Sequence, residues 1–439
     1  MKLSLFGVGA AGVRIVDRLL EAEASRDREF TGGNVLVFDT TTDAFAEATF
    51  VPEQRRVLLG ETHPDVDHAT AATGDGSDAA DDGGRTGAGV DGDPDLGAEV
   101  AQTELPEIRR ALDSVDETEV DAALVVLGLG GGTGCGAGSV LLEELQSIYE
   151  DPVYVLGVLP AATEPDRRAL TAARGVRTVV PLADAVFPVD NETWREGADR
   201  IADRYEAIND VVMTRLLSLF AAGEAESTAS SEIRVDPADL SRTLAVGGMA
   251  TIGQATHELD TGPDGLLDRL RHLLRLADES DRPTDAATVK RLIKRALESK
   301  LTLPCDVSSA DRVLLLLSGP PGEISRKGFE TGRYLLEQEA DTVEVLAGDE
   351  PLSGATSITA TVLLANVTAV PRIDQLQQRA LDVQEETAES SEATDGATAE
   401  ADGATAEADH DHDHDHEFEF RNGRGESRPV EPDNTESGP

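Results

Sequence analysis

The stretch GLGGGTGCGAG, residues 128–138, contains seven glycines in eleven positions. It follows the apolar segment DAALVVLGLG and precedes SVLLEELQSIYE, in which Val140, Leu141, Leu145 and Ile148 recur at helical spacing. The local order is therefore strand, glycine loop, helix. Such a loop points backbone N–H groups into one concavity at the positive end of a helix dipole, which favours an anion, most often a phosphate. A flexible turn is the alternative, but a turn usually needs only one or two glycines.

This glycine-rich loop lacks the lysine that completes a Walker A phosphate loop. The chain has five lysines, namely Lys2, Lys290, Lys294, Lys300 and Lys327, so residues 3–289 hold none. No lysine in that range can bridge phosphates or form a Schiff base. Charge neutralisation at the loop must therefore come from backbone dipoles, Mg²⁺ or arginine.

The chain has 439 residues, enough for two or three domains. Its formal net charge is −47, from 85 acidic and 38 basic residues, and the acidic residues are spread along the whole chain. This charge argues against non-specific binding to nucleic acid. An acidic, lysine-poor composition is typical of a protein built for a salt-rich cytoplasm; a mesophilic protein with an acidic tail is the alternative. No signal peptide or transmembrane segment is predicted, and the two cysteines suit a reducing, cytoplasmic compartment.

The charge predicts that the protein loses structure or solubility at low ionic strength and recovers both near molar salt. Repulsion among the carboxylates opposes the compact state, and the Debye length falls from ~10 Å at 0.1 M salt to ~3 Å at 1 M. Circular dichroism across a KCl series measures this effect. A fold that is indifferent to salt down to tens of millimolar would contradict the prediction.

Residues 1–204 are predicted to form a doubly wound, Rossmann-like α/β domain with a parallel sheet, because strand-like and helix-like segments alternate along them. Residues 62–95 interrupt this domain with an acidic, glycine-rich stretch that is poor in apolar residues and is expected to be a solvated loop. A long central helix is predicted over residues 205–222, within a helical pattern that begins near residue 199.

A second domain, of α+β class, is predicted over residues 235–383, with strands at RVLLLLSG, TVEVLAG and TATVLLANV. The acidic remainder, residues 385–439, contains the repeat DGATAEADGATAEAD and the run HDHDHDHEFEF. This composition cannot bury a core, so it predicts a disordered tail that is free to bind partner proteins. The alternating His and Asp residues suggest a metal, but a disordered strip has no fixed ligand geometry, and no metal site is predicted there.

A second glycine loop lies at the N-terminus. GVGAAG, with Gly7, Gly9 and Gly12, matches G-x-G-x-x-G between a strand and a helix, and the next strand ends at Asp39, where dinucleotide-binding folds keep their ribose acid. On these residues alone, the chain reads as an NAD-dependent enzyme. That fold needs only one glycine-rich turn for its pyrophosphate, whereas this chain has two. Two loops that converge on one ligand favour a nucleotide with three phosphates.

The order of GVGAAG, GAGVDGDPDLGAEVA, GGGTGCG and a long helix containing YEAIND resembles the tubulin/FtsZ superfamily. LTLPCDV, RKGFETGRYLLEQ and VPRIDQLQQ resemble its archaeal CetZ branch, so that the resemblance covers residues 1–383 apart from the acidic loop. It implies a cytoskeletal protein that binds GTP, with Mg²⁺, assembles head to tail with copies of itself, hydrolyses GTP at the subunit interface and controls cell shape. A GTP-binding filament subunit or regulator with weak or no hydrolysis is the alternative.

The resemblance also implies which residues hold the nucleotide. The first phosphate loop comprises Ala10, Ala11, Gly12, Val13 and Arg14, and the second comprises Gly130, Gly131, Gly132, Thr133, Gly134 and Gly136. Glu164 and Arg168 fall where the family contacts ribose and the nearby phosphates, and Asn191, Tyr205 and Asn209 fall on the base side. Tyr205 can stack on guanine, and the Asn209 amide can hydrogen-bond its edge. Without the two loops, this pair would be read as an ordinary semi-buried pair on a helix.

RVDPADL, residues 234–240, resembles the catalytic stretch of the superfamily and makes Asp236 and Asp239 the candidate catalytic carboxylates. They are expected to orient and polarise the water that attacks GTP held by the next subunit. An ordinary helix start is the alternative, with Asp236 as N-cap and Pro237 at the first helical position. Both readings can hold, because a helix N-terminus also presents carboxylates rigidly at a surface.

Three residues depart from the pattern of the family. Ala10 stands where CetZ-like chains carry Gln, Val13 where they carry Gly, and Asp39 where Asn is expected. Val13 is predicted to restrict the nucleotide pocket. Together these departures predict weakened nucleotide binding or turnover.

Overall fold

The computed structural model describes residues 1–26, 30–66, 89–197, 200–220, 235–259, 286–321, 323, 326–352 and 354–385. The N-terminal half contains, in chain order, β1 (Leu3–Val8), α1 (Gly9–Arg26), β2 (Val35–Asp39), α2 (Asp43–Glu47), β3 (Arg56–Leu58), α3 (Pro94–Thr103), α4 (Leu105–Leu112), β4 (Ala122–Gly128), α5 (Gly138–Ile148), β5 (Val153–Leu159), α6 (Asp166–Leu182) and β6 (Ala185–Asp190). It is followed by α7 (Tyr205–Phe220), α8 (Pro237–Leu244), β7 (Ala250–Glu258), α10 (Ala286–Leu297), β8 (Arg312–Gly319), α11 (Arg326–Glu339), β9 (Val345–Pro351) and β10 (Ser357–Ala365). A further helix spans residues 371–385.

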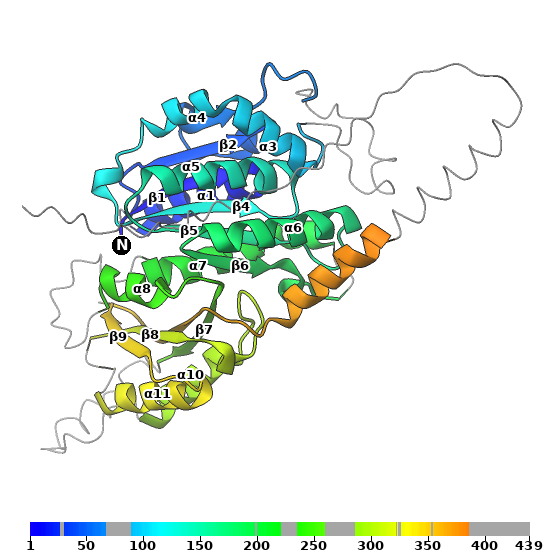
Figure 1. The fold of residues 1–439 in the computed structure, drawn as a ribbon. Helices are drawn as coiled ribbons and strands as arrows, with labels where there is room; N and C mark the ends of the chain where they lie inside the picture. Colours follow the sequence, from blue (N-terminus) through cyan, green and yellow to red (C-terminus); the bar gives the residue numbers. More distant parts are fainter. Residues whose placement is uncertain are drawn as a thin grey trace, which may run out of the picture. The chain divides into compact units, whose positions relative to one another are not determined.

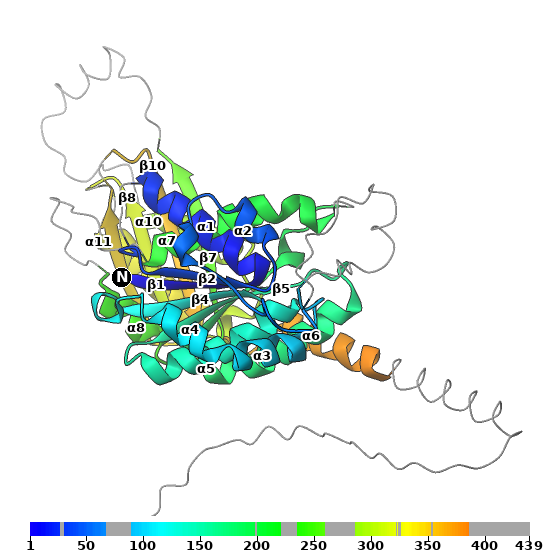
Figure 2. The ribbon, with the colours of Figure 1, turned by 90° about the horizontal axis from the view of Figure 1, so that it is seen from above.

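The N-terminal sheet has the strand order β3-β2-β1-β4-β5-β6, with every neighbouring pair parallel. Alternate residues of its strands enter two separate cores. In β1, Leu5 packs with residues of α1, α2 and α7, and Phe6 packs with residues of α3 to α6. Figure 2 shows these two helix layers on opposite faces of the sheet. This is the predicted doubly wound α/β architecture, and the order reverses between β1 and β4.

The second sheet has the order β7-β10-β8-β9. Strand β10 pairs antiparallel with β7 and β8, whereas β8 pairs parallel with β9. Its alternate residues also enter two cores: Leu315 packs with α10 and α11, and Leu316 packs with α7 and α8. Figure 1 shows α7 between the two sheets. The mixed sheet with its helices is the predicted α+β part of the fold, so the predicted fold class is confirmed.

Helix α7 is buried at the junction of the two sheets. Ile208, Val212 and Leu216 are almost inaccessible, and the ring of Phe220 lies 5.8 Å from that of Phe187 in β6. The helix runs over 16 residues from Tyr205, after a 3₁₀ turn at Ile201–Arg204. Residues 221–234, where the prediction ended the helix, lie outside the described residues.

Strands β3 and β7 were not predicted. The β7 sequence, ATIGQATHE, looks too polar for a sheet strand, but its polar side chains pair across strands. The Gln254 amide donates to the Thr361 hydroxyl at 2.9 Å, and Thr256 and Thr359 hydroxyls lie 3.0 Å apart. Such cross-strand pairs stabilise a strand without an apolar pattern.

Two predicted solvated segments lie largely beyond the described part of the chain. The structure does not describe residues 67–88 of the acidic loop or residues 386–439 of the tail. The described ends of the acidic loop differ from the prediction, because Val66 and Val90 are only 7% and 2% exposed. Across the described helices, none is both long enough and apolar enough to cross a membrane.

Candidate functional site

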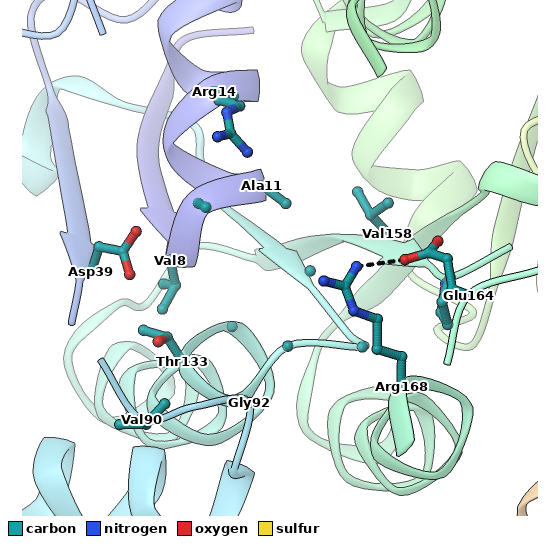
Figure 3. A pocket seen from close by; sticks show the side chains of 18 of the residues that line it. Val8, Ala11, Arg14, Asp39, Val90, Gly92, Thr133, Val158, Glu164 and Arg168 are labelled. Carbon is teal, nitrogen blue, oxygen red and sulfur yellow. Dashed lines mark hydrogen bonds and ion pairs between the residues drawn. The ribbon is translucent and has the colours of Figure 1, made fainter. Parts of the chain in front are cut away.

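A cavity of about 340 Å³ opens at the carboxyl ends of β1 and β4. This is the switch point of the sheet, where helices leave neighbouring strands in opposite directions and ligands bind in doubly wound folds. Both glycine loops line it: Ala10, Ala11 and Arg14 from the first, and Gly130–Gly134 from the second. Figure 3 shows the two loops facing each other across the cavity. Two phosphate-type loops thus share one cavity, which argues against a single-loop NAD site.

Two residues predicted in the first loop serve the packing of α1 instead. A Cβ atom on Gly12 would lie 2.3 Å from the Val126 carbonyl oxygen of β4, so glycine allows the helix to approach the sheet. Val13 is completely buried in the core between α1 and the sheet and does not line the cavity. The prediction that Val13 narrows the pocket is therefore wrong, because its side chain points away from it.

The second glycine loop is shorter than predicted. The helical turns begin within it: a π-helical turn covers Thr133–Ala137 and continues directly into α5. The Cys135 amide already donates to the Gly131 carbonyl oxygen at 3.0 Å. The amides at the start of a helix lack acceptors inside it, so this first turn presents N–H groups at the cavity. π-Helical turns are frequent at functional sites.

Three alternating glycines in this run are required by close backbone packing. A Cβ on Gly132 would lie 2.6 Å from the Asp93 amide nitrogen, and one on Gly134 would lie 2.5 Å from the Gly128 carbonyl oxygen. On Gly136 it would lie 2.1 Å from the Pro94 carbonyl oxygen, in the first turn of α3. Gly136 does not line the cavity. The many glycines are therefore needed for two reasons. They let the first helical turn pack closely against β4 and α3, and they let a ligand approach the backbone.

A threonine pair links the second loop to the end of β2. The Thr133 and Thr40 hydroxyl oxygens lie 2.7 Å apart, and both residues are buried at the cavity wall. Thr40 was not predicted as a site residue. Thr40 directly follows Asp39, which was singled out in the sequence, so the position next to Asp39 was the available sign that Thr40 lies at the site.

Asp39 ends β2 at the cavity wall and is only 3% exposed. Its Oδ1 accepts the Thr40 amide at 2.8 Å, whereas the described residues give its Oδ2 no hydrogen-bond partner. Burial raises the pKa of Asp39 to about 6, although hydrogen bonds from the Thr40 and Thr41 amides act to lower it. Figure 3 shows this carboxylate pointing into the cavity. A buried carboxylate oxygen without a hydrogen-bond partner, such as Asp39 Oδ2, is suited to binding a cation or a hydroxyl donor.

The opposite end of the cavity is formed by Glu164, Arg168 and Tyr205. The Arg168 guanidinium donates to Glu164 Oε2 at 2.5 Å, and the Tyr205 hydroxyl donates to the same oxygen at 3.4 Å. Burial lowers the pKa of Arg168, but the charge of Glu164 and its hydrogen bonds outweigh this and raise it. Asn191, 5% exposed, and Asn209 line the same end. All five residues predicted for the sugar and base side therefore line the cavity.

Residues just before α3 complete the cavity and were missed within the predicted solvated loop. Val90, Asp91 and Gly92 line it together with Arg167 of α6. A Cβ on Gly92 would lie 2.7 Å from the Arg167 guanidinium, and the φ angle of Gly92 is +74°. The motif GAGVDGDPDLGAEVA was part of the family resemblance, and its glycines and aspartates were the signal for this segment.

The cationic side chains that line the cavity are all arginines, in keeping with the absence of lysine from residues 3–289. Arg14, Arg167 and Arg168 line it, and each lies near a carboxylate. Arg14 pairs with Glu47 at 2.8 Å, and Arg167 lies 3.9 Å from Asp91. These pairs hold the guanidinium groups in place, so arginine and backbone amides are the groups that can meet a polyphosphate.

Asp236 and Asp239 do not line this cavity. They form the start of α8: Asp236 Oδ1 accepts the Asp239 amide at 2.9 Å, and Asp239 Oδ2 accepts the Asp236 amide at 3.3 Å. This reciprocal capping box, with Pro237 at the first helical position, fits the helix-start reading of the sequence. The Asp239 side chain keeps 29% of its surface exposed. The two carboxylates are therefore held rigidly at a surface away from their own cavity.

The family models that match this chain divide it into two consecutive parts. Residues 2–199 match the GTPase domain of the tubulin/FtsZ family. Residues 198–382 match the C-terminal domain of tubulin-like CetZ proteins.

Curated relatives and solved structures with similar sequences span nearly the whole chain. The tubulin-like protein CetZ1 of Haloferax volcanii is 36% identical over 397 residues, which cover 89% of this chain and 94% of CetZ1. CetZ3 of the same organism is 37% identical over 395 residues, with 90% and 95% coverage. The structure of H. volcanii CetZ1 as a GDP-bound monomer has a TM-score of 0.70 at 33% identity, covering 88% and 100%. That of H. volcanii CetZ2 as a GTPγS-bound protofilament has 0.71 at 30% identity, covering 88% and 99%.

Proposed function

This chain belongs to the tubulin-like CetZ family, and we propose that it binds GTP in the cavity between β1 and β4, assembles head to tail and hydrolyses GTP at the subunit interface. We further propose that its filaments control cell shape in the cytoplasm. The observation that carries the proposal is the convergence of two glycine loops on one cavity, with Asn191, Tyr205 and Asn209 at its far end. A GTPγS-bound protofilament is the form in which the relative CetZ2 was solved.

The proposed binding mode follows the shape of the cavity. Amides at the start of the α5 helical turns and the residues Ala10, Ala11 and Arg14 meet the phosphates. Glu164 accepts ribose hydroxyls, oriented by Arg168. Tyr205 stacks on guanine, and the Asn209 and Asn191 amides hydrogen-bond the edge of the base. The nucleotide retained by purified protein tests this: bound GTP or GDP supports it, and retained NAD would overturn it.

The proposed hydrolysis requires two subunits. The second glycine loop offers no base, because Thr133, Cys135 and Ser139 are the only polar side chains in residues 128–139, and the first loop offers only the cationic Arg14. Burial raises the pKa of Cys135 to about 12, so its thiol stays protonated. Asp236 and Asp239 of the neighbouring subunit are proposed to orient the attacking water and accept its proton. The alternative, a filament subunit or regulator without efficient hydrolysis, is distinguished by phosphate release from purified protein in molar salt.

The cavity residues fit a magnesium ion that accompanies the phosphates. Mg²⁺ is usually held by one or two carboxylates together with substrate phosphates and waters, and it neutralises phosphate charge. The open Oδ2 of the buried Asp39 supplies such a carboxylate. Beside a polyphosphate, this anionic oxygen would repel the ligand unless a cation lay between them. We therefore propose Asp39 as the residue through which the protein holds Mg²⁺.

Asp39→Asn is expected to stabilise the nucleotide-free protein but to reduce the effect of Mg²⁺ on GTP binding. The pKa of Asp39 rises from 3.8 to about 6 on folding, so the ionised carboxylate costs stability above pH 6 and nothing below pH 4. The variant should gain about 2–3 kcal/mol at pH 8 and no more than about 0.5 kcal/mol at pH 4. Thermal unfolding at both pH values, and GTP titration with and without Mg²⁺, measure the two effects. Equal magnesium dependence in the variant and the wild type would contradict the proposed role.

Asn209→Ala is expected to weaken GTP binding by roughly 1–3 kcal/mol, because a polar edge of the base is left unpaired. Asn209 lies one helical turn from Tyr205 and also lines the cavity, so the truncation leaves the stacking surface in place. Isothermal titration with GTP and ATP in molar KCl provides the measurement, and ATP binding should be poor from the start. Equal affinity of the wild-type protein for ATP and GTP would overturn the guanine assignment.

A further inference from the structure

The C-terminal helix, residues 371–385, places two arginines against chain segments that line the nucleotide cavity. Arg372 and Arg379 are seven residues apart, which is two helical turns, so they lie on one face of the helix. Ile373, Leu376 and Ala380 of the same helix are buried and anchor it. Building on the function proposed above, we propose that Arg372 and Arg379 are positioning residues for the nucleoside end of the GTP site.

Arg372 holds the two chain segments that meet at this end of the cavity. Its Nε donates to Asp190 Oδ1 at 3.0 Å, and its Nη2 donates to the Pro160 carbonyl oxygen at 2.7 Å. The Arg372 and Asp190 side chains are 10% and 3% exposed, so this ion pair is well shielded from solvent. Asp190 immediately precedes Asn191, and Pro160 itself lines the cavity. One guanidinium thus ties the Asn191 segment to the segment that follows β5.

Arg379 holds residues 160–166, the segment that follows β5. Its Nη1 donates to the Ala162 carbonyl oxygen at 2.9 Å, and its Nη2 donates to the Glu164 carbonyl oxygen at 2.8 Å. Its Nε donates to Asp166 Oδ1 at 2.7 Å. The planar fork of a guanidinium is suited to bridging several acceptors at once, and an ammonium group cannot reproduce that geometry.

Residues 160–166 are also held by hydrogen bonds that do not involve the two arginines. The Ala161 amide donates to Glu164 Oε1 at 2.7 Å, and the Ala162 amide donates to Glu192 Oε2 at 2.8 Å. The segment is therefore held by its own Glu164 side chain, by Glu192 and by the C-terminal helix. These hydrogen bonds fix the position of the Glu164 carboxylate, which meets the ribose in the proposed binding mode. The glycine loops that meet the phosphates make none of these contacts with the two arginines.

A positioning role makes a different prediction from a merely structural one. If the arginines position the ribose and base contacts, their loss raises the dissociation constant for GTP while the number of binding sites per chain stays the same. If they only stabilise the fold, their loss lowers the fraction of competent protein and leaves the dissociation constant of the remainder unchanged. Isothermal titration reports the two quantities separately.

The experiment compares GTP titrations of the full-length wild type, Arg379→Gln and Arg379→Lys in molar KCl, with thermal unfolding of the nucleotide-free proteins. Arg109→Gln is the matched control, because Arg109 makes a two-pronged contact with Glu144, at 2.6 and 3.0 Å, away from the cavity. Both Arg379 variants should bind GTP roughly 3- to 30-fold more weakly at unchanged stoichiometry. The control should bind as the wild type does.

An unchanged dissociation constant in both Arg379 variants would overturn the positioning role, whether or not the number of sites fell. Arg372→Lys provides a second variant, with the same expectation, in which the shielded charge pair with Asp190 is kept. A wild-type protein that binds no GTP would instead overturn the proposed function, and this inference with it. The two failures are distinguishable because the first appears only in the variants.

Discussion

Asp239→Ala is expected to bind GTP and to assemble, yet to hydrolyse GTP about 10²–10⁴-fold more slowly, the usual loss for a positioned acid–base group. The filaments of this variant should also last longer, because GTP is retained at the interfaces. Asp239 lies beyond α7, whose 16 residues extend about 24 Å from the cavity at 1.5 Å per residue. Its carboxylate is therefore proposed to act on the nucleotide of another subunit, so that its loss should spare the binding site in its own.

Asp239→Asn separates catalysis from helix capping. The Asp239 carboxylate also accepts the Asp236 amide in the capping box, so alanine removes a cap as well as a catalytic group. Asparagine keeps an oxygen that can accept this amide but cannot take a proton from water. Phosphate release from both variants at one protein concentration gives the comparison. If Asp239→Asn hydrolysed GTP at the wild-type rate, the carboxylate would be only a cap.

Gly136→Ala is expected to destabilise the fold by about 3 kcal/mol, although Gly136 lies outside the cavity. Its Cβ would lie 2.1 Å from the Pro94 carbonyl oxygen and 2.7 Å from the Ala98 amide nitrogen. Both are backbone atoms of α3, so relief requires α3 to move away from the start of α5. Thermal unfolding in molar KCl measures the loss.

Gly131→Ala is the matched control for this substitution. The nearest atom to its Cβ would be the Gly128 carbonyl oxygen at 3.8 Å, which is ordinary contact. Gly131 lines the cavity, so its methyl group should disturb GTP binding while the melting temperature stays close to that of the wild type. Equal stability of Gly136→Ala and Gly131→Ala would show that the close approach of α3 does not require glycine.

The sequence predicted the N-terminal sheet and most of the cavity because these features depend on local patterns. Alternating apolar strands and helices with glycine turns between them fix the order of elements, and the doubly wound class follows. Both glycine loops line one cavity because they follow strands whose carboxyl ends lie at the same edge of the sheet. Glu164, Tyr205 and Asn209, which also line it, were predicted from the resemblance to the tubulin/FtsZ superfamily rather than from a local pattern. Their roles toward GTP remain proposals.

The features that were missed depend on contacts between distant parts of the chain. The role of Gly136 is set by Pro94, and the hydroxyl of Thr133 is shared with Thr40, 93 residues away. The direction of Val13 follows from the rotation of α1 on the sheet, which the spacing G-x-G-x-x-G does not report. The strand β7 was missed because its polar side chains find their partners in distant segments, such as Ser218 of α7 and Thr361 of β10 for Gln254.

The rate of phosphate release per subunit, measured against protein concentration in molar KCl with excess GTP and Mg²⁺, tests the central claim most directly. If Asp236 and Asp239 act only on the GTP of a neighbouring subunit, hydrolysis should be absent at high dilution and should appear above a threshold concentration, together with filaments. Asp239→Ala should assemble at a similar threshold without the rise in rate. A specific rate that stays constant from high dilution to concentrations far above assembly would mean that each subunit hydrolyses its own GTP, and would contradict the account.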